Sequence, residues 1–370
     1  MKKRVKIILI ASGIVILLVA FGVSYVTQKI LVKLPKGVTK VDATIAASSE
    51  DIFLSNNELY SYVKKFGAKQ TIARLDTLSE KFGSCHDAAH KVGRFTYALS
   101  KEKSFQLCGS ECHSGCYHGA TEQYFKEHGT AHLSESLKVL CSGELNSFFS
   151  HQCLHGIGHG LMAWTNYDLP EALKSCDLLT AGQDSCWTGV FMENIVGGLS
   201  PQDGHMTKYL SEDPQFPCSA VDSKYKSSCY FLQTSRFMQL YKSDFSKVAN
   251  ACLGAPVLYQ RSCTESMGRD VDGVYRGNPK GAIDSCSFLP PGDLRIGCLV
   301  GAAQDTFWDP AGQVTARLFC SLLTDTIEKS NCYETIFQRA PLVLINTTEK
   351  KQFCASVEDA YRERCRQVVI

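Results

Sequence analysis

The chain has 370 residues, of which 44% are hydrophobic, and a formal net charge of +2, so it has enough apolar sequence for a sizeable core. Beyond its first few residues it carries no strongly basic or acidic block, and we therefore expect no nucleic-acid surface. Its eighteen cysteines are even in number and begin only at Cys85. This usage favours an oxidising compartment and a framework of disulfides.

The N-terminus has the pattern of a membrane segment. Lys2, Lys3 and Arg4 precede an uncharged run from Ile7 to Thr27, about the ~20 residues that a helix needs to cross a bilayer. Basic residues before such a run keep the N-terminus in the cytoplasm. We therefore predict an anchor over residues 1–27, a tether over 28–50 and an extracytoplasmic (periplasmic or extracellular) domain over 51–370. The alternative is a cleaved signal peptide, whose apolar region is usually about 7–15 residues long.

Further along the chain, the cysteines come in close pairs. The second members of successive pairs follow one another at steps of 33, 43, 34, 35, 34 and 33 residues, and a near-constant step of this size indicates a stacked repeat. The expected disulfides are Cys141–Cys153, Cys176–Cys186, Cys218–Cys229, Cys252–Cys263, Cys286–Cys298, Cys320–Cys332 and Cys354–Cys365.

Each repeat is predicted to be a helical hairpin. In residues 282–307 an amphipathic segment carries Cys286, a Pro-Pro-Gly break follows, and a second segment begins near Cys298. β-Branched alternation is scarce, so strands are not expected. A disulfide across such a short connection would stabilise each hairpin by roughly 2–3 kcal/mol. We predict an all-α fold in which disulfide-stapled hairpins stack into an α-solenoid, preceded by the N-terminal transmembrane helix.

This plan resembles that of cysteine-rich tetratricopeptide-like repeat proteins, which are exported α-solenoids with one disulfide per hairpin. The resemblance covers residues 85–370 and concerns architecture alone, because the tetratricopeptide signature of Trp, Leu-Gly and Tyr at set offsets is missing from the sequence. It therefore implies no functional residue.

Two units depart from the regular spacing. The first contains two additional cysteines, for which the simplest pairing is Cys85–Cys112 and Cys108–Cys116, with an exchange between Cys112 and Cys116 left open. The step of 43 contains a Gly/Pro-rich insertion over residues 197–217, which carries His205. Long loops of this kind are either functional or plain surface loops, so the insertion is a lid over the histidines described next or a neutral loop.

Histidines are concentrated in residues 85–160, where nine of the ten in the chain occur. In CHDAAH and CLHGIGHG two histidines lie four residues apart, and in CYHGATE a histidine and a glutamate do. Residues four apart share one face of a helix. In the last two motifs the paired residues lie two and six positions after the cysteine, so the positions repeat in adjacent units. Neighbouring helices lie about 8–10 Å apart, so such side chains can converge. The candidate ligands are His86, His90, His118, Glu122, His155 and His159.

These residues favour a transition-metal site. Imidazole suits zinc, copper and iron, whereas one carboxylate among many histidines argues against calcium or magnesium. The predicted function is therefore that of a protein with a transition-metal site. If it is an enzyme, we expect a metal-dependent hydrolase or oxidoreductase, with Glu122 as general acid or base if it is not a ligand. Asp87, Tyr117 and Glu193 are candidates for orienting the ligands, because a ligating histidine usually donates its other N–H to a neighbour.

Two other functions are compatible with the sequence. In the first, the protein is a non-enzymatic scaffold whose solenoid face binds a protein or peptide, and the histidines are packed structural residues. In the second, two histidines are the axial ligands of a non-covalently bound haem.

Overall fold

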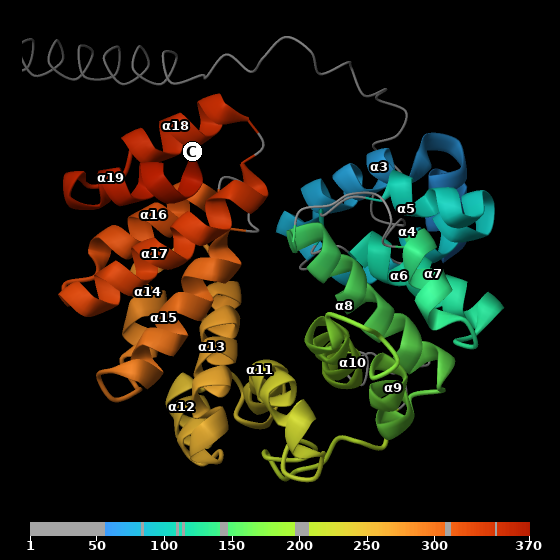
Figure 1. Ribbon diagram of the computed structural model, residues 1–370, viewed down its shortest axis with the longest axis horizontal. Coiled ribbons are helices and arrows are strands. Elements are labelled where there is room, and N and C mark those ends of the chain that lie inside the picture. Colours follow the sequence, from blue (N-terminus) through green and yellow to red (C-terminus); the bar gives the residue numbers. More distant parts are fainter. Residues whose placement is uncertain are drawn as a thin grey trace, which may run out of the picture. The chain divides into compact units, whose positions relative to one another are not determined.

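The computed structural model describes residues 56–82, 85–108, 111–112, 115–140, 147–196, 207–307, 312–344 and 346–370, all within one compact unit, Asp51–Ile370. The regular secondary structure in these ranges is helical, with no strand (Figure 1). The prediction of an all-α fold is therefore confirmed. The predicted anchor and tether lie outside the described residues. Within the described part of the chain, no helix combines the length and apolarity that a membrane span requires.

The helices alternate between the first and second members of hairpins. The first helices are α3 (Asn56–Phe82), α5 (Ser104–Leu107, after a 3-10 turn at Lys101–Lys103), α7 (Leu133–Leu140), α9 (Leu169–Cys176), α12 (Phe245–Leu253), α14 (Pro279–Cys286), α16 (Gly312–Leu322) and α18 (Thr347–Ala355). The second helices are α4 (His86–Ser100), α6 (Gly115–His128), α8 (Ser147–Trp164), α10 (Gln183–Val196), α11 (Ser223–Leu240), α13 (Val257–Val274), α15 (Asp293–Thr306), α17 (Thr326–Val343) and α19 (Asp359–Val369).

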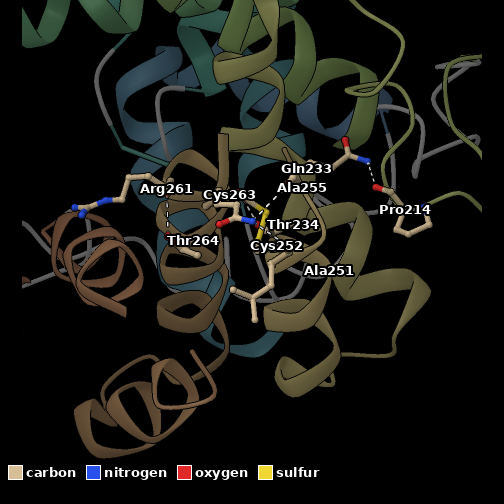
Figure 2. Close-up of a disulfide and its surroundings, with 12 residues drawn as sticks. Pro214, Gln233, Thr234, Ala251, Cys252, Ala255, Arg261, Cys263 and Thr264 are labelled. Atoms are coloured by element: carbon tan, nitrogen blue, oxygen red, sulfur yellow. Dashed lines mark hydrogen bonds between the residues drawn. A yellow bond between two sulfur atoms is a disulfide. The ribbon is translucent and has the colours of Figure 1, made fainter. Parts of the chain in front are cut away.

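Disulfides staple the hairpins at their turns. In the regular units the first cysteine lies at the end of the first helix and its partner lies inside the second helix. Figure 2 shows this arrangement for Cys252 of α12 and Cys263 of α13. Eight of the nine expected pairs are present: Cys85–Cys112, Cys108–Cys116, Cys176–Cys186, Cys218–Cys229, Cys252–Cys263, Cys286–Cys298, Cys320–Cys332 and Cys354–Cys365. Cys153 is also disulfide-bonded, but its expected partner Cys141 lies outside the described residues.

The unit that contains the insertion is built differently. Cys218 lies in a run of turns before α11, and the described residues 207–222 form no first helix. Gln233 of α11 holds this segment, because its amide nitrogen donates to the carbonyl of Pro214 at 2.8 Å (Figure 2) and to that of Phe216 at 2.8 Å. Residues 197–206, including His205, lie outside the described residues, so the lid stays a prediction.

The second helices pack against one another in chain order, from α4 to α19. In three of these contacts, glycines let the backbones touch. A Cβ atom on Gly119 of α6 would lie 1.8 Å from the carbonyl oxygen of His90 in α4, and one on Gly189 of α10 would lie 1.9 Å from that of His155 in α8. We call α4–α6, α8–α10 and α13–α15 the glycine-locked pairs. Close approach of this kind holds side chains of adjacent helices within reach of each other.

Candidate metal centre

A buried cluster of histidines and glutamates lies across four successive second helices. It comprises His86 and His90 from α4, His118 and Glu122 from α6, His155 and His159 from α8, and Glu193 from α10, and we call it the histidine cluster. His118 and His159 are 1% exposed and Glu193 is 3% exposed, whereas His86 is only partly buried. Neighbouring imidazole rings have centroids 4.3–6.4 Å apart. The structure thus brings all six predicted ligands together.

The cluster has two layers because successive turns of adjacent helices lie side by side. The layer near the helix starts contains His86, His118, His155 and Thr188. The layer one turn later contains His90, Glu122, His159 and Glu193. In the second layer histidine and glutamate alternate along the four helices, so each of its histidines lies beside a carboxylate of the next helix.

In α4, hydrogen bonds fix the tautomers of both histidines. The Nδ1 atom of His86 lies 2.9 Å from the carbonyl oxygen of Cys112, which can only accept, so this nitrogen carries the proton. The Nδ1 atom of His90 donates in the same way to Glu122 Oε1 at 2.6 Å. In the neutral rings each Nε2 atom therefore carries a lone pair, and these two atoms lie 3.1 Å apart.

The pair in α8 repeats this arrangement. The Thr188 hydroxyl donates to the Ser185 carbonyl at 2.7 Å, so it accepts from His155 Nδ1 at 3.0 Å. His159 Nδ1 donates to Glu193 Oε2 at 2.7 Å. The two Nε2 atoms again carry lone pairs in the neutral rings and lie 3.2 Å apart.

Two lone pairs at such distances repel unless a cation lies between the nitrogens that carry them. Ligating nitrogens lie 2.0–2.1 Å from zinc, so two of them on a tetrahedral ion are separated by about 3.3–3.4 Å. The Nε2 separations of 3.1 and 3.2 Å in the two pairs come within a few tenths of an ångström of this value. Each pair thus has the donor chemistry and nearly the spacing that a tetrahedral metal ion requires.

His118 lies between the two pairs. Its Nδ1 atom is 3.3 Å from His90 Nε2, while its own Nε2 atom is buried and makes no hydrogen bond among the described residues. Its ring stacks on that of His159, with centroids 4.3 Å apart and planes 13° apart. Ligand atoms within 4.8 Å of one another form three groups here: His86, His90 and His118; His118, His155 and His159; and His90, Glu122, His159 and Glu193. These groups can hold a metal ion.

Glu122 is held as a carboxylate. One of its oxygens accepts from His90 and the other from the Arg94 guanidinium. Burial alone would raise the pKa of Glu122, but the positive charge of Arg94 and the contact with His90 lower it to about 2. A carboxyl group with so low a pKa is a poor general acid or base near neutral pH.

Two histidines of the cluster, His118 and His155, favour the neutral form. Burial lowers the pKa of both His118 and His155, and the neighbouring imidazoles lower it further. Neutral imidazole is the form that binds a metal.

Of the residues predicted to orient the ligands, Glu193 accepts a hydrogen bond from a predicted ligand, His159. Asp87 is exposed on α4, and the Tyr117 ring packs against Phe105 with a centroid distance of 6.4 Å. Neither belongs to a ligand group.

Sequence reasoning missed several groups that orient the ligands. Thr188 and Met192 follow Cys186 at the same two offsets as the ligands of the preceding helices, so the repeat itself was the available signal. The Met192 sulfur lies 3.4 Å from His155 Nε2. Arg94 lies one helical turn after His90, and the Cys112 carbonyl, a backbone group, leaves no signal in the sequence. Comparison of the chain with protein-family models, curated proteins and solved structures finds no match.

Proposed function

We propose that the protein binds a transition metal, zinc, copper or iron, in the histidine cluster. The observation that carries this proposal is the pairing of the Nε2 atoms. In both α4 and α8 the Nδ1 atoms donate to acceptors, which leaves a lone pair on each of two Nε2 atoms that lie 3.1 or 3.2 Å apart. Imidazole nitrogen at this spacing selects these metals over calcium and magnesium.

In this proposal Glu122 and Glu193 orient ligands instead of binding the ion. Each accepts the Nδ1–H of a histidine, which fixes the tautomer and makes the opposite nitrogen a better donor. Arg94 occupies the second oxygen of Glu122. The sequence-based role of Glu122 as ligand or general acid/base is therefore replaced by an orienting role, and hydrolysis that uses this carboxylate as base is disfavoured.

The haem alternative is poorly supported by the geometry of the pairs. Two axial ligands must lie on opposite faces of the macrocycle. The Nε2 atoms within each pair are only 3.1 or 3.2 Å apart and extend from one helix face, so a pair cannot sandwich a porphyrin.

The setting that we propose for the centre is a membrane-tethered, extracytoplasmic α-solenoid. The disulfides and the chain-order packing of the second helices support the solenoid and the oxidising compartment. Its repeated faces would also suit a protein or peptide partner. If the N-terminal segment is an uncleaved anchor, the protein isolated from cells should stay with membranes after a high-salt wash and should retain residue 1. A soluble product that begins near residues 28–48 would instead identify a signal peptide.

Metal analysis of protein made without a histidine tag tests the proposal. The wild-type chain should contain zinc, copper or iron, and a His155→Ala variant should contain less. His128→Ala is the matched control, since His128 bonds to the Tyr97 hydroxyl outside the cluster. The metal should also stabilise the folded protein, so that the unfolding midpoint rises. At a free metal concentration of one hundred times the dissociation constant, the free energy of unfolding should increase by about 2.7 kcal/mol. Protein that is metal-free and gains no stability from any of the three ions would establish packed structural histidines.

A further inference from the structure

We propose that the histidine cluster holds two metal ions, one at the α4 pair and one at the α8 pair, bridged by His118. This inference rests on the proposed metal binding and specifies the number of ions and the ligand they share.

The first support is a structural duplication. The glycine-locked pairs α4–α6 and α8–α10 contain the same parts: two histidines four residues apart on the first helix, and a glutamate on the second helix that accepts from the later histidine at 2.6 or 2.7 Å. The Nε2 atoms have nearly equal separations in the two pairs. Each glycine-locked pair therefore carries its own two-nitrogen site, and a site present twice accommodates two ions.

The second support is the distance between the sites. Among the described residues, no group of ligand atoms lying within 4.8 Å of one another contains both His86 and His155. One ion with bonds of 2.0–2.1 Å needs all its ligands within about 4.2 Å of one another. The ligands are therefore too widely spread for a single ion to bind all four histidines of the two pairs.

His118 completes both sites. It is the one residue that belongs to both three-histidine groups. Its Nδ1 atom lies 3.3 Å from His90 Nε2, which is the separation expected for two ligands on one tetrahedral ion. Its Nε2 atom is buried without a hydrogen-bond partner, and a buried polar atom of this kind calls for a ligand.

To bridge two ions, His118 must lose its ring proton and its ring must rotate. A neutral imidazole has one lone pair, so to bind two ions His118 must release its ring proton to solvent and bind each ion through one nitrogen. Coordination lies in the plane of the ring, whereas His118 is stacked parallel to His159. The His118 ring must therefore turn out of this stack. The ring packs closely on Gly156 of α8, where a Cβ atom would lie only 3.2 Å from His118 Cδ2 and would crowd the ring further.

Copper(II) titration of the full chain tests this inference, with metal analysis and electron paramagnetic resonance as readouts. We compare the wild-type protein with a variant in which His86, His90, His155 and His159 are all alanine. Per chain, the wild type should bind two more copper ions than this variant. Two copper ions joined by an imidazolate couple antiferromagnetically, so their resonance signal should be largely lost. The variant pairs His86→Ala/His90→Ala and His155→Ala/His159→Ala should each retain one ion with a full signal.

His118→Gln tests the bridge separately from the sites, since it should retain two ions and regain the signal of two independent centres. His128→Ala is the control and should behave as wild type. Two ions with undiminished signal in the wild type would overturn the bridge. A single ion in the wild type that is lost in both pair variants would overturn the two-ion centre but would leave the proposed function standing. If a variant misfolds, the copper content and resonance signal of the wild type alone test the two-ion centre. Failure to bind any copper, zinc or iron would instead refute the proposed function itself.

Discussion

Gly119→Ala tests whether close backbone contact sets the geometry of the first histidine pair. The added Cβ would lie 1.8 Å from the His90 carbonyl oxygen, whereas real Cβ contacts are essentially never below 3.0 Å. Helices α4 and α6 must therefore separate by at least 1.2 Å, the difference between these two distances. A shift of this size along the bond from His90 to Glu122 would lengthen it from 2.6 Å to about 3.8 Å, beyond hydrogen-bonding range.

The cost follows from these contacts. Overpacking costs about 1–3 kcal/mol, and a buried hydrogen bond to a charged group contributes about 1.5–3 kcal/mol. The better helix propensity of alanine returns about 1 kcal/mol. We therefore expect Gly119→Ala to lower the free energy of unfolding by about 2–5 kcal/mol and to lower the metal content as well.

Urea unfolding with the disulfides intact measures this effect, and Gly273→Ala is the matched control. Gly273 also lies in a helix, α13, but a Cβ atom there would meet nothing within 4 Å, so alanine should be neutral or stabilising by up to about 1 kcal/mol. Equal stability of the two variants would show that the α4–α6 contact yields without cost, and the reasoning would be refuted.

Three further predictions concern orientation, pH and capping. Glu193→Gln should weaken metal binding about 10–100-fold without unfolding the protein, because the carboxylate that orients His159 becomes an amide; an unchanged dissociation constant would contradict this. In protein stripped of metal, stability should fall as the pH drops below about 6.5, because the unfolded chain takes up protons there that His118 and His155, with lowered pKa values, do not. Glutamine at both positions should reduce this slope in urea unfolding at pH 5.5 and 7.5. Asp325→Ala should cost about 0.5–2 kcal/mol, since its side chain caps α17 by accepting two backbone N–H groups, and an unaltered unfolding midpoint would count against it.

The helical fold could be predicted because the cysteine spacing constrains it strongly. Two cysteines 10 to 12 residues apart on either side of a turn leave room for little except a hairpin, and the helix ends follow from the turn residues. The unit with Cys218 differs from this pattern. Pro214 and Pro217 lie just before that cysteine, where a first helix would need backbone N–H donors that proline lacks, so the chain forms turns there.

The candidate centre could be predicted only in part. Its histidines share helix faces at repeated positions, which the sequence displays directly. A search for repeated histidines does not find Thr188, yet its hydroxyl accepts the Nδ1–H of His155. The role of Glu122 depends on both of its oxygens being engaged, and the partner Arg94 comes from a different helix. The partners of Thr188 and Glu122 lie on neighbouring helices, so the spacing of residues within one helix does not reveal them.

The disulfide between Cys85 and Cys112 makes the geometry of the first histidine pair depend on thiol oxidation. His86 follows Cys85 directly, and the carbonyl of Cys112, a residue with a φ of 52°, accepts its Nδ1–H. The crosslink and the hydrogen bond that orients His86 thus share Cys112, and Cys85 is the chain neighbour of His86. Under the proposed function, we therefore expect the α4 pair to bind metal well only after this disulfide has closed. We expect a reductant that opens the crosslink to loosen the contact of His86 with the Cys112 carbonyl and to weaken metal binding at α4.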